Sequence, residues 1–165
     1  MADSSNFPPG LKRSAAMVVL KHQEHFLLLR RAKPPFAGHY LPVGGKLEPF
    51  EDPYSAALRE LKEETGLCLE YLHFGGILTE TSPTAYNWQS HIYWAEIGWI
   101  APPACPEGVL EWISFDRLGH IPTPPTDLLI YQYLRAGKPF VFNALYDASM
   151  CMRCMSEEIE GIEVW

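Results

Sequence analysis

The stretch GGKLEPFEDPYSAALRELKEETGL, residues 44–67, limits the fold of this chain more than any other part of its sequence. It predicts a loop that leads into a helix over about residues 53–65, where apolar residues recur at helical spacing. Asp52 is typical of an N-cap residue, and Pro53 is typical of the first helical position. Gly66 follows the predicted helix, where a glycine commonly ends one. The segment therefore indicates both ends of one helix.

Three glutamates share one face of this predicted helix, because Glu60 lies three and four residues before Glu63 and Glu64. Like charges at this spacing repel one another, so the group needs a partner. Hard divalent cations such as Mg²⁺ prefer oxygen ligands and would turn that repulsion into binding. The alternative is a solvated acidic face that Arg59 and Lys62 screen. A different face is apolar and would pack against a sheet; it comprises Tyr54, Ala57, Leu58 and Leu61.

The whole segment resembles the Nudix box, whose pattern it matches at every fixed position. Those positions are Gly45, Glu51, Arg59, Glu60, Leu61, Glu63, Glu64, Gly66 and Leu67. The resemblance implies an α+β Nudix fold, with a mixed β-sheet sandwiched between α-helices. It also implies a MutT-like pyrophosphohydrolase, which cleaves a nucleoside diphosphate linked to another moiety.

The same resemblance implies which residues hold a metal. Glu60, Glu63 and Glu64 are the expected metal ligands and catalytic residues, and the Gly44 carbonyl is a further expected ligand. The metal is expected to be Mg²⁺, with Mn²⁺ as the alternative. A metal-activated water would attack a phosphorus atom of the diphosphate. Either Glu60 or Glu64 would take the proton.

Arg59 is expected to be a catalytic residue that orients these glutamates, and Glu51 is its expected partner. Gly45, Glu51 and Gly66 are the structural positions of the motif. These roles also follow from the resemblance and not from the spacing of the residues.

Four residues beyond the fixed positions of the box are further candidates. By likeness to MutT-like enzymes, Arg31, Lys46 and Asp127 would bind substrate, with Asp127 at the edge of a purine base. Glu107 would be a distal metal ligand. For Arg31 and Lys46 the alternative is a solvated surface cation, and for Glu107 it is a solvated loop. For Asp127 the alternative is capping of a second helix together with Thr126.

Tryptophans in the second half of the chain could stack on a base. Aromatic residues that alternate along strands usually fill a core instead, so no tryptophan is assigned to a site. The four residues considered are Trp88, Trp94, Trp99 and Trp112.

Hydrophobic patterning predicts strands on both sides of the box. A hairpin is expected near the N-terminus, and prolines and glycines predict a loop over residues 33–45. A second helix is expected over residues 126–137. Residues 157–165 are compatible with either a strand or a packing tail. The predicted strands cover residues 15–20, 25–32, 74–80, 88–98, 109–118 (ending in a helical turn) and 138–146.

The composition favours one domain over residues 1–165, with a polar leader at about residues 1–13. With 13 Lys and Arg against 20 Asp and Glu, the net charge of −7 disfavours binding to a DNA or RNA polymer. No apolar run approaches the roughly 20 residues of a membrane span, and no secretory signal is evident, so a cytoplasmic location is expected. Cys151 and Cys154 form a CxxC without a second metal-binding pair, so ordinary thiols are expected.

The leading functional hypothesis is hydrolysis of a nucleoside triphosphate, such as an oxidised purine nucleotide. Its expected partner is this small molecule, and a homodimer is left open. One alternative is a Nudix sensor domain that binds a nucleotide without catalysis, and another is hydrolysis of ADP-sugars or dinucleoside polyphosphates. Isomerisation of a diphosphate-linked isoprenoid ranks last, because no residue in the sequence supports it.

Overall fold

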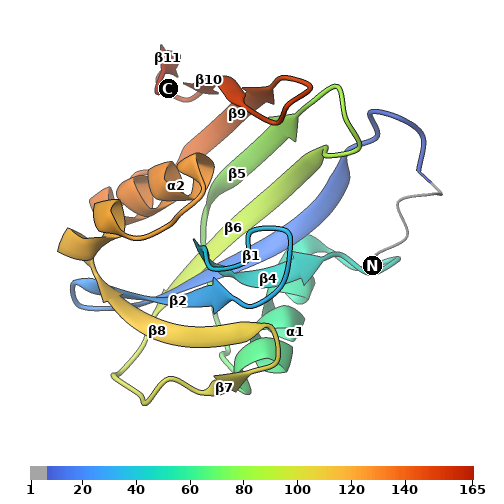
Figure 1. Ribbon diagram of the computed structural model, residues 1–165. Helices are drawn as coiled ribbons and strands as arrows, with labels where there is room; N and C mark the ends of the chain where they lie inside the picture. The colour runs from blue at the N-terminus through green and yellow to red at the C-terminus, as the bar shows by residue number, and fades with distance from the viewer. Residues whose placement is uncertain (1–6) are drawn as a thin grey trace.

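A mixed β-sheet of 11 strands forms the centre of the protein, with α-helices packed on its two faces (Figure 1). The computed structural model describes residues 7–165. The strands are β1 Arg13–His22, β2 His25–Arg31, β3 Tyr40–Leu41, β4 Val43–Lys46, β5 His73–Thr81, β6 Trp88–Glu96, β7 Ala104–Cys105, β8 Gly108–Ser114, β9 Phe140–Tyr146, β10 Met152–Glu157 and β11 Ile162–Glu163. The helices are α1 Pro53–Thr65, the short 3₁₀-helix η1 Phe115–His120 and α2 Pro125–Ala136.

The strands follow the order β11-β10-β9-β5-β6-β1-β2-β8-β7, while β3 pairs with β2 and β4 pairs with β1. The pairs β1 with β6 and β5 with β9 are parallel, and the remaining pairs are antiparallel. The expected N-terminal hairpin is confirmed, because β1 and β2 pair with His22 opposite His25. The expected mixed sheet between helices is also confirmed.

Alternation along β1 divides the core into two layers. Val18 and Leu20 face α1, whereas Val19 between them faces the side of the sheet that α2 covers. In α1 the expected apolar face is confirmed: Ala57 and Leu61 are fully buried, and Tyr54 and Leu58 pack against the same cluster. In α2 the corresponding buried side chains are Ile130 and Tyr131. Each helix therefore packs against one face of the sheet.

Two parts of the sheet differ from the sequence-based expectation. The loop predicted over residues 33–45 contains β3 and β4, so that prediction is wrong for its second half. Glycines and Pro42 give this segment little strand propensity, and its pairing with β1 and β2 imposes the extended backbone. At the C-terminus, β10 was not expected, and the ambiguous tail contains the short strand β11.

Two further sequence-based expectations concern the cysteines and membrane spans. The four cysteines are free thiols. In the described part of the chain, no helix has the length and apolar character needed to cross a membrane. Part of the expected polar leader, residues 1–6, lies outside the described residues.

Candidate active site

Helix α1 begins and ends where its sequence predicts. The Asp52 side chain caps the helix by accepting a hydrogen bond of 2.9 Å from the backbone N–H of Ser55. At the other end Gly66 adopts a left-handed conformation with φ of 74°, and its N–H donates to the carbonyl of Lys62. These local signals fix where α1 begins and ends, and the packing of its apolar face turns the glutamates away from the core cluster.

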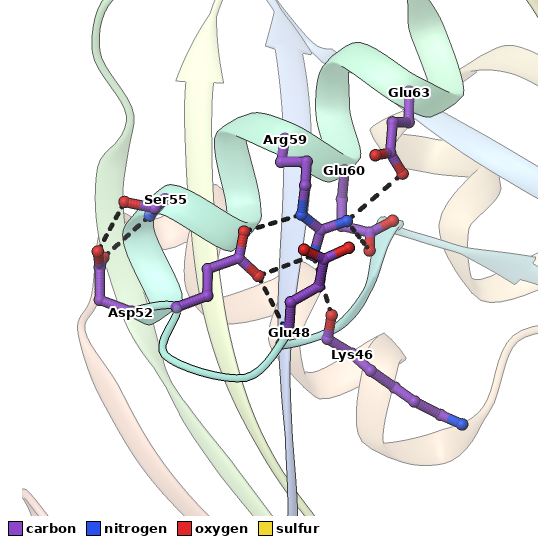
Figure 2. A network of polar contacts seen from close by, with 8 residues as sticks. Lys46, Glu48, Asp52, Ser55, Arg59, Glu60 and Glu63 are labelled. Atoms are coloured by element: carbon purple, nitrogen blue, oxygen red, sulfur yellow. Dashed lines mark hydrogen bonds and ion pairs between the residues drawn. The ribbon is translucent and has the colours of Figure 1, made fainter.

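Arg59 joins the loop before α1 to the acidic face of the helix (Figure 2). Its Nε and Nη2 atoms each donate to one oxygen of Glu51 at 2.8 Å, and these bonds lower the pKa of Glu51 to about 2. Its Nη1 atom donates to Glu60 at 2.7 Å and lies 3.4 Å from a Glu63 oxygen. Nη2 also donates to the Lys46 carbonyl at 3.1 Å. The expected pairing of Arg59 with Glu51 is confirmed.

Glu64 is the buried member of the three glutamates, with 8% of its surface exposed. One of its oxygens accepts a hydrogen bond of 3.1 Å from the backbone N–H of Gly44 on β4. Burial raises the pKa of Glu64 to about 7; the negative charges of Glu60 and Glu107 add to this effect, and Gly44 and Arg31 oppose it. The side chain therefore takes up or releases a proton near neutral pH.

Two adjacent glycines let β4 approach its neighbours closely. A Cβ atom at Gly45 would lie only 2.6 Å from a carboxylate oxygen of Glu60. At Gly44, which has a φ of 144°, a Cβ atom would lie 2.2 Å from the Ala16 carbonyl oxygen on β1. Glycine is therefore required at position 44 for β4 to lie against β1, and at position 45 it leaves room for the Glu60 carboxylate.

A cavity of about 870 Å³ opens beside these residues. Three groups of charged or polar side chains share it: the glutamates of α1, residues at the ends of β2, β4 and β7, and residues around the start of α2. Apolar side chains of the sheet and of α2 form the remaining wall, among them Leu78, Ile92 and Ile130. The members of the first two groups are Glu60, Glu63, Glu64, Arg31, Lys46 and Glu107.

Comparison with known proteins identifies the family. A family model described as the NUDIX domain matches residues 10–134. The chain belongs to the Nudix family. Its matches span only part of two curated relatives: 34% of the length of Nudix hydrolase 25 of Arabidopsis thaliana and 44% of the length of a second protein. The second of these is the asymmetrical bis(5'-nucleosyl)-tetraphosphatase of Caenorhabditis elegans, which is 38% identical over 63 residues, or 36% of this chain.

Solved structures agree with the Nudix fold. A MutT protein from Bacillus halodurans superposes with a TM-score of 0.76 over 89% of this chain and 98% of that chain, at 22% identity. The NUDIX domain of Shewanella oneidensis NrtR, solved with ADP-ribose, has a TM-score of 0.67 over 81% of this chain and 94% of that chain, at 20% identity. At these identities the likeness concerns the fold.

The Nudix fold brings the candidate residues from outside the helix to the same cavity. Arg31 ends β2, and its Nη1 lies 3.8 Å from a carboxylate oxygen of Glu107. Glu107 lies in the turn between β7 and β8 and lines the cavity, so it is not simply a loop residue turned to solvent. Lys46 lines the cavity as well, but its side chain extends away from Arg59 (Figure 2). The Lys46 Nζ atom lies 5.9 Å from the ring centre of Trp88.

Asp127 also lines the cavity, from the first turn of α2. The alternative in which it caps this helix together with Thr126 is wrong. Pro124 is the N-cap residue, and no side chain caps the helix. Only 7% of the Asp127 surface is exposed; burial and then the negative charge of Glu80 raise its pKa well above 3.8. Burial therefore favours the neutral, protonated form of this carboxyl group.

The tryptophans have different environments. Trp88 lines the cavity, and the Arg13 guanidinium lies 4.1 Å from its ring centre. Trp94 packs against the core on the α2 side of the sheet. Trp99 is 56% exposed and stacks on Trp112, so the expectation that these aromatic residues fill a core is wrong for Trp99. It lies after β6, where the alternation has ended.

Sequence reasoning missed one polar group in this Nudix cavity. Glu80 on β5 is buried, and its two oxygens accept hydrogen bonds from the hydroxyls of Tyr86, at 3.1 Å, and Tyr146, at 2.8 Å. The only signal was the carboxylate at the end of the predicted strand over residues 74–80. The tyrosines are distant in sequence or lie in a loop, so no local pattern links them to Glu80.

The residues of α1 fit a divalent cation in their chemistry, and Nudix proteins generally use such ions. Glu60, Glu63 and Glu64 offer carboxylate oxygens to one cavity. Among residues 7–165, however, no three His, Cys, Asp or Glu side chains converge as a ready-made metal group. Arg59 instead partners Glu60 and approaches Glu63. Arg59 thus partly screens the acidic face, as expected if that face were a solvated surface. The burial of Glu64, however, shows that the face is not simply solvated.

Proposed function

We propose that this Nudix protein hydrolyses the diphosphate linkage of a nucleotide with the help of Mg²⁺ or Mn²⁺. One observation carries the proposal: the carboxylates of Glu60, Glu63 and Glu64 line the same cavity as the cationic side chains of Arg31 and Lys46. Such a cavity can hold divalent cations and polyphosphate side by side. The named activity of the C. elegans relative supports this class of reaction.

Glu60, Glu63 and Glu64, together with the Gly44 carbonyl, would hold the cation. When bound, the cation supplies an activated water and neutralises charge on the phosphates. Arg59 positions Glu60 through its hydrogen bond and ties that glutamate to Glu51. The proposed roles of Glu64, Arg31 and Lys46 are to accept a proton and to bind the phosphates.

Glu64 is the proposed proton acceptor for the attacking water. Arg59 occupies an oxygen of Glu60, whereas Glu64 is held only by the backbone N–H of Gly44. As the water oxygen bonds to phosphorus, its proton moves to Glu64 and the bond to the leaving phosphate breaks. Arg31 and Lys46 bind the phosphates, and Glu107 is a proposed distal metal ligand.

A purine nucleoside triphosphate, such as an oxidised purine nucleotide, is the proposed substrate. Asp127 supports this choice because its buried carboxyl group lines the same cavity as the apolar side chains of Leu78 and Ile130, which suit a flat base. A buried polar group in such surroundings orients a flat ligand by hydrogen bonding. The likeness in fold to the B. halodurans MutT protein is consistent with this choice.

Nucleotide binding without catalysis is the second candidate. It is favoured by the engagement of Glu60 with Arg59 and by the fold shared with the NrtR domain that was solved with ADP-ribose. ADP-sugars and dinucleoside polyphosphates are the alternative substrates, the latter because of the C. elegans relative.

A substrate panel separates these candidates. Purified protein is incubated with Mg²⁺ and with nucleoside triphosphates, oxidised purine nucleotides, ADP-ribose and dinucleoside tetraphosphates, and products are identified by chromatography. Cleavage at a diphosphate linkage that stops when a chelator removes Mg²⁺ supports the proposal. Tight binding of a nucleotide by folded protein, measured by calorimetry without any turnover, would instead support the binding role.

A further inference from the structure

Four buried or half-buried polar side chains meet where β5, β9 and α2 border the cavity. We call them the Glu80 cluster; its members are Glu80, Tyr86, Asp127 and Tyr146. All four line the cavity, and the two carboxyl groups are only 6% and 7% exposed. They come from β5, the loop before β6, the first turn of α2 and the end of β9. None of them belongs to the Nudix box.

The hydrogen bonds of the cluster leave it with unused capacity. Each Glu80 oxygen accepts one phenol hydrogen bond, yet a carboxylate oxygen has two lone pairs. Within residues 7–165, the charged groups that affect the pKa of Glu80 or Asp127 include no Lys, Arg or His. A buried carboxylate without a cationic partner is stabilised by each further hydrogen-bond donor that it gains. Because Glu80 lines the cavity, its remaining lone pairs suit the donors of a ligand.

The two carboxyl groups have raised pKa values but differ in their hydrogen bonds. Burial raises the pKa of Glu80, but the hydrogen bonds from Tyr146 and Tyr86 oppose this effect and favour the charged form. Asp127 has no such bonds, and burial together with the charge on Glu80 raises its pKa further. Of the two carboxyl groups, burial without hydrogen bonds favours the protonated form of Asp127. The tyrosine hydrogen bonds favour Glu80 as the acceptor, and burial favours Asp127 as the donor.

We propose that Glu80 is a specificity-determining residue that selects a guanine-type base by accepting hydrogen bonds from its ring N–H and its adjacent amino group. This inference rests on the proposed nucleotide substrate and deepens it. The carbonyl group next to the ring N–H accepts a hydrogen bond from the Asp127 hydroxyl. Leu78, Ile92 and Ile130 provide the apolar wall for the ring.

Other bases do not match this order of donors and acceptors. Adenine has a ring nitrogen that accepts, and it would face the acceptors of Glu80. Hypoxanthine keeps the ring N–H and the carbonyl but lacks the amino group. It therefore makes one hydrogen bond fewer to the charged acceptor Glu80. Uracil has its N–H between two carbonyls, one of which would face Glu80. Unpaired buried polar groups make such mismatches unfavourable.

The wild-type protein tests the inference without any mutation. The ratio kcat/KM is measured with guanosine, inosine and adenosine triphosphates under the same Mg²⁺ conditions. Loss of one hydrogen bond to a charged group is expected to make the inosine nucleotide about 10- to 100-fold poorer than the guanosine nucleotide. The adenosine nucleotide should be poorer still. Equal values for the guanosine and inosine nucleotides would overturn the inference.

The variant Glu80→Gln tests the residue itself, with Glu96→Gln at the exposed end of β6 as the matched control. The amide replaces one acceptor by a donor, so the preference for guanosine over inosine nucleotide should fall about tenfold, mainly through KM. A role confined to stability would lower thermal stability without changing this preference. If Glu80→Gln does not fold, Tyr146→Phe, which removes one donor to Glu80, should reduce the preference in the same direction. An unchanged preference in a folded variant would overturn the inference.

Calorimetry separates this inference from the proposed hydrolysis. If no nucleotide is hydrolysed, the proposed catalysis fails, but binding of guanosine and inosine triphosphates can still be compared. Tighter binding of the guanosine nucleotide by about tenfold or more would uphold the role of Glu80. Equal binding, or no binding of either nucleotide, would overturn it.

Discussion

Arg59 and Glu51 form two parallel hydrogen bonds of 2.8 Å that tie helix α1 to the loop after β4. The same guanidinium donates to Glu60 and to the Lys46 carbonyl. One planar group therefore sets the position of the loop, the helix and a proposed metal ligand together. An ammonium group cannot replace it, because it lacks the planar fork that serves several acceptors at once.

Arg59→Lys should lower kcat about 10- to 100-fold, because Glu60 loses the donor that positions it. Small displacements of groups at a reacting centre are costly. The fold should remain, since Lys keeps the positive charge beside the glutamates. Steady-state kinetics and circular dichroism measure both effects. Activity equal to wild type would contradict a positioning role for Arg59.

Gly45→Ala should impair metal binding without disturbing the rest of the fold. The added Cβ atom would lie 2.6 Å from a Glu60 oxygen and must push that carboxylate aside. We expect Mg²⁺ affinity and kcat/KM to fall roughly tenfold or more, measured by calorimetry and kinetics. Gly98→Ala is the matched control, because nothing lies within 4 Å of a Cβ atom at that position. Similar behaviour of the two variants would count against a role for Glu60 in metal binding.

Helix α1 illustrates what local sequence signals can predict. Its N-cap residue Asp52, its first residue and its terminal Gly66 all lie as expected, because capping depends on residues a few positions apart. Strand β4 was missed for the opposite reason. Its glycines disfavour strands intrinsically, and only pairing with β1, a segment distant in sequence, holds them extended.

The candidate site likewise contains contacts that a local motif predicts and contacts that only the fold creates. The pairing of Arg59 with Glu51 follows from a short motif and was expected. Glu80 was not, because its partner Tyr146 lies 66 residues further along the chain and only the sheet brings them together. The raised pKa of Asp127 likewise depends on burial between elements, which the sequence does not reveal.

Glu64→Gln should reduce turnover by about 10² to 10⁴, the usual contribution of a positioned proton acceptor. The amide oxygen of Gln can still accept the hydrogen bond from Gly44, so the variant should keep its fold. Glu70→Gln, at an exposed position after α1, should behave as wild type. Single-turnover kinetics measure the chemical step. A loss of less than threefold in Glu64→Gln would remove this residue from the proposed mechanism.

Asp127→Asn should change how stability depends on pH. Because the pKa of Asp127 is raised in the folded protein, its contribution to stability is greatest below about 3.8, its ordinary pKa, and declines as pH rises. Asn has no proton to lose. The free energy of unfolding of the variant should therefore gain on that of wild type as pH rises above about 3.8, by at most about 1.4 kcal/mol per pH unit. Chemical denaturation at several pH values from about 3.5 upward measures this difference, and parallel curves would show that the pKa of Asp127 is not raised by folding.

The origin of the oxygen in the product shows whether this Nudix protein transfers water to a phosphate. Folded protein is incubated with Mg²⁺ and guanosine triphosphate in ¹⁸O-labelled water, and the products are analysed by mass spectrometry. We expect one labelled oxygen in a phosphate product, and chelation of Mg²⁺ should stop its formation. Bound but intact nucleotide, with no labelled phosphate from any nucleotide tried, would contradict the proposed hydrolysis.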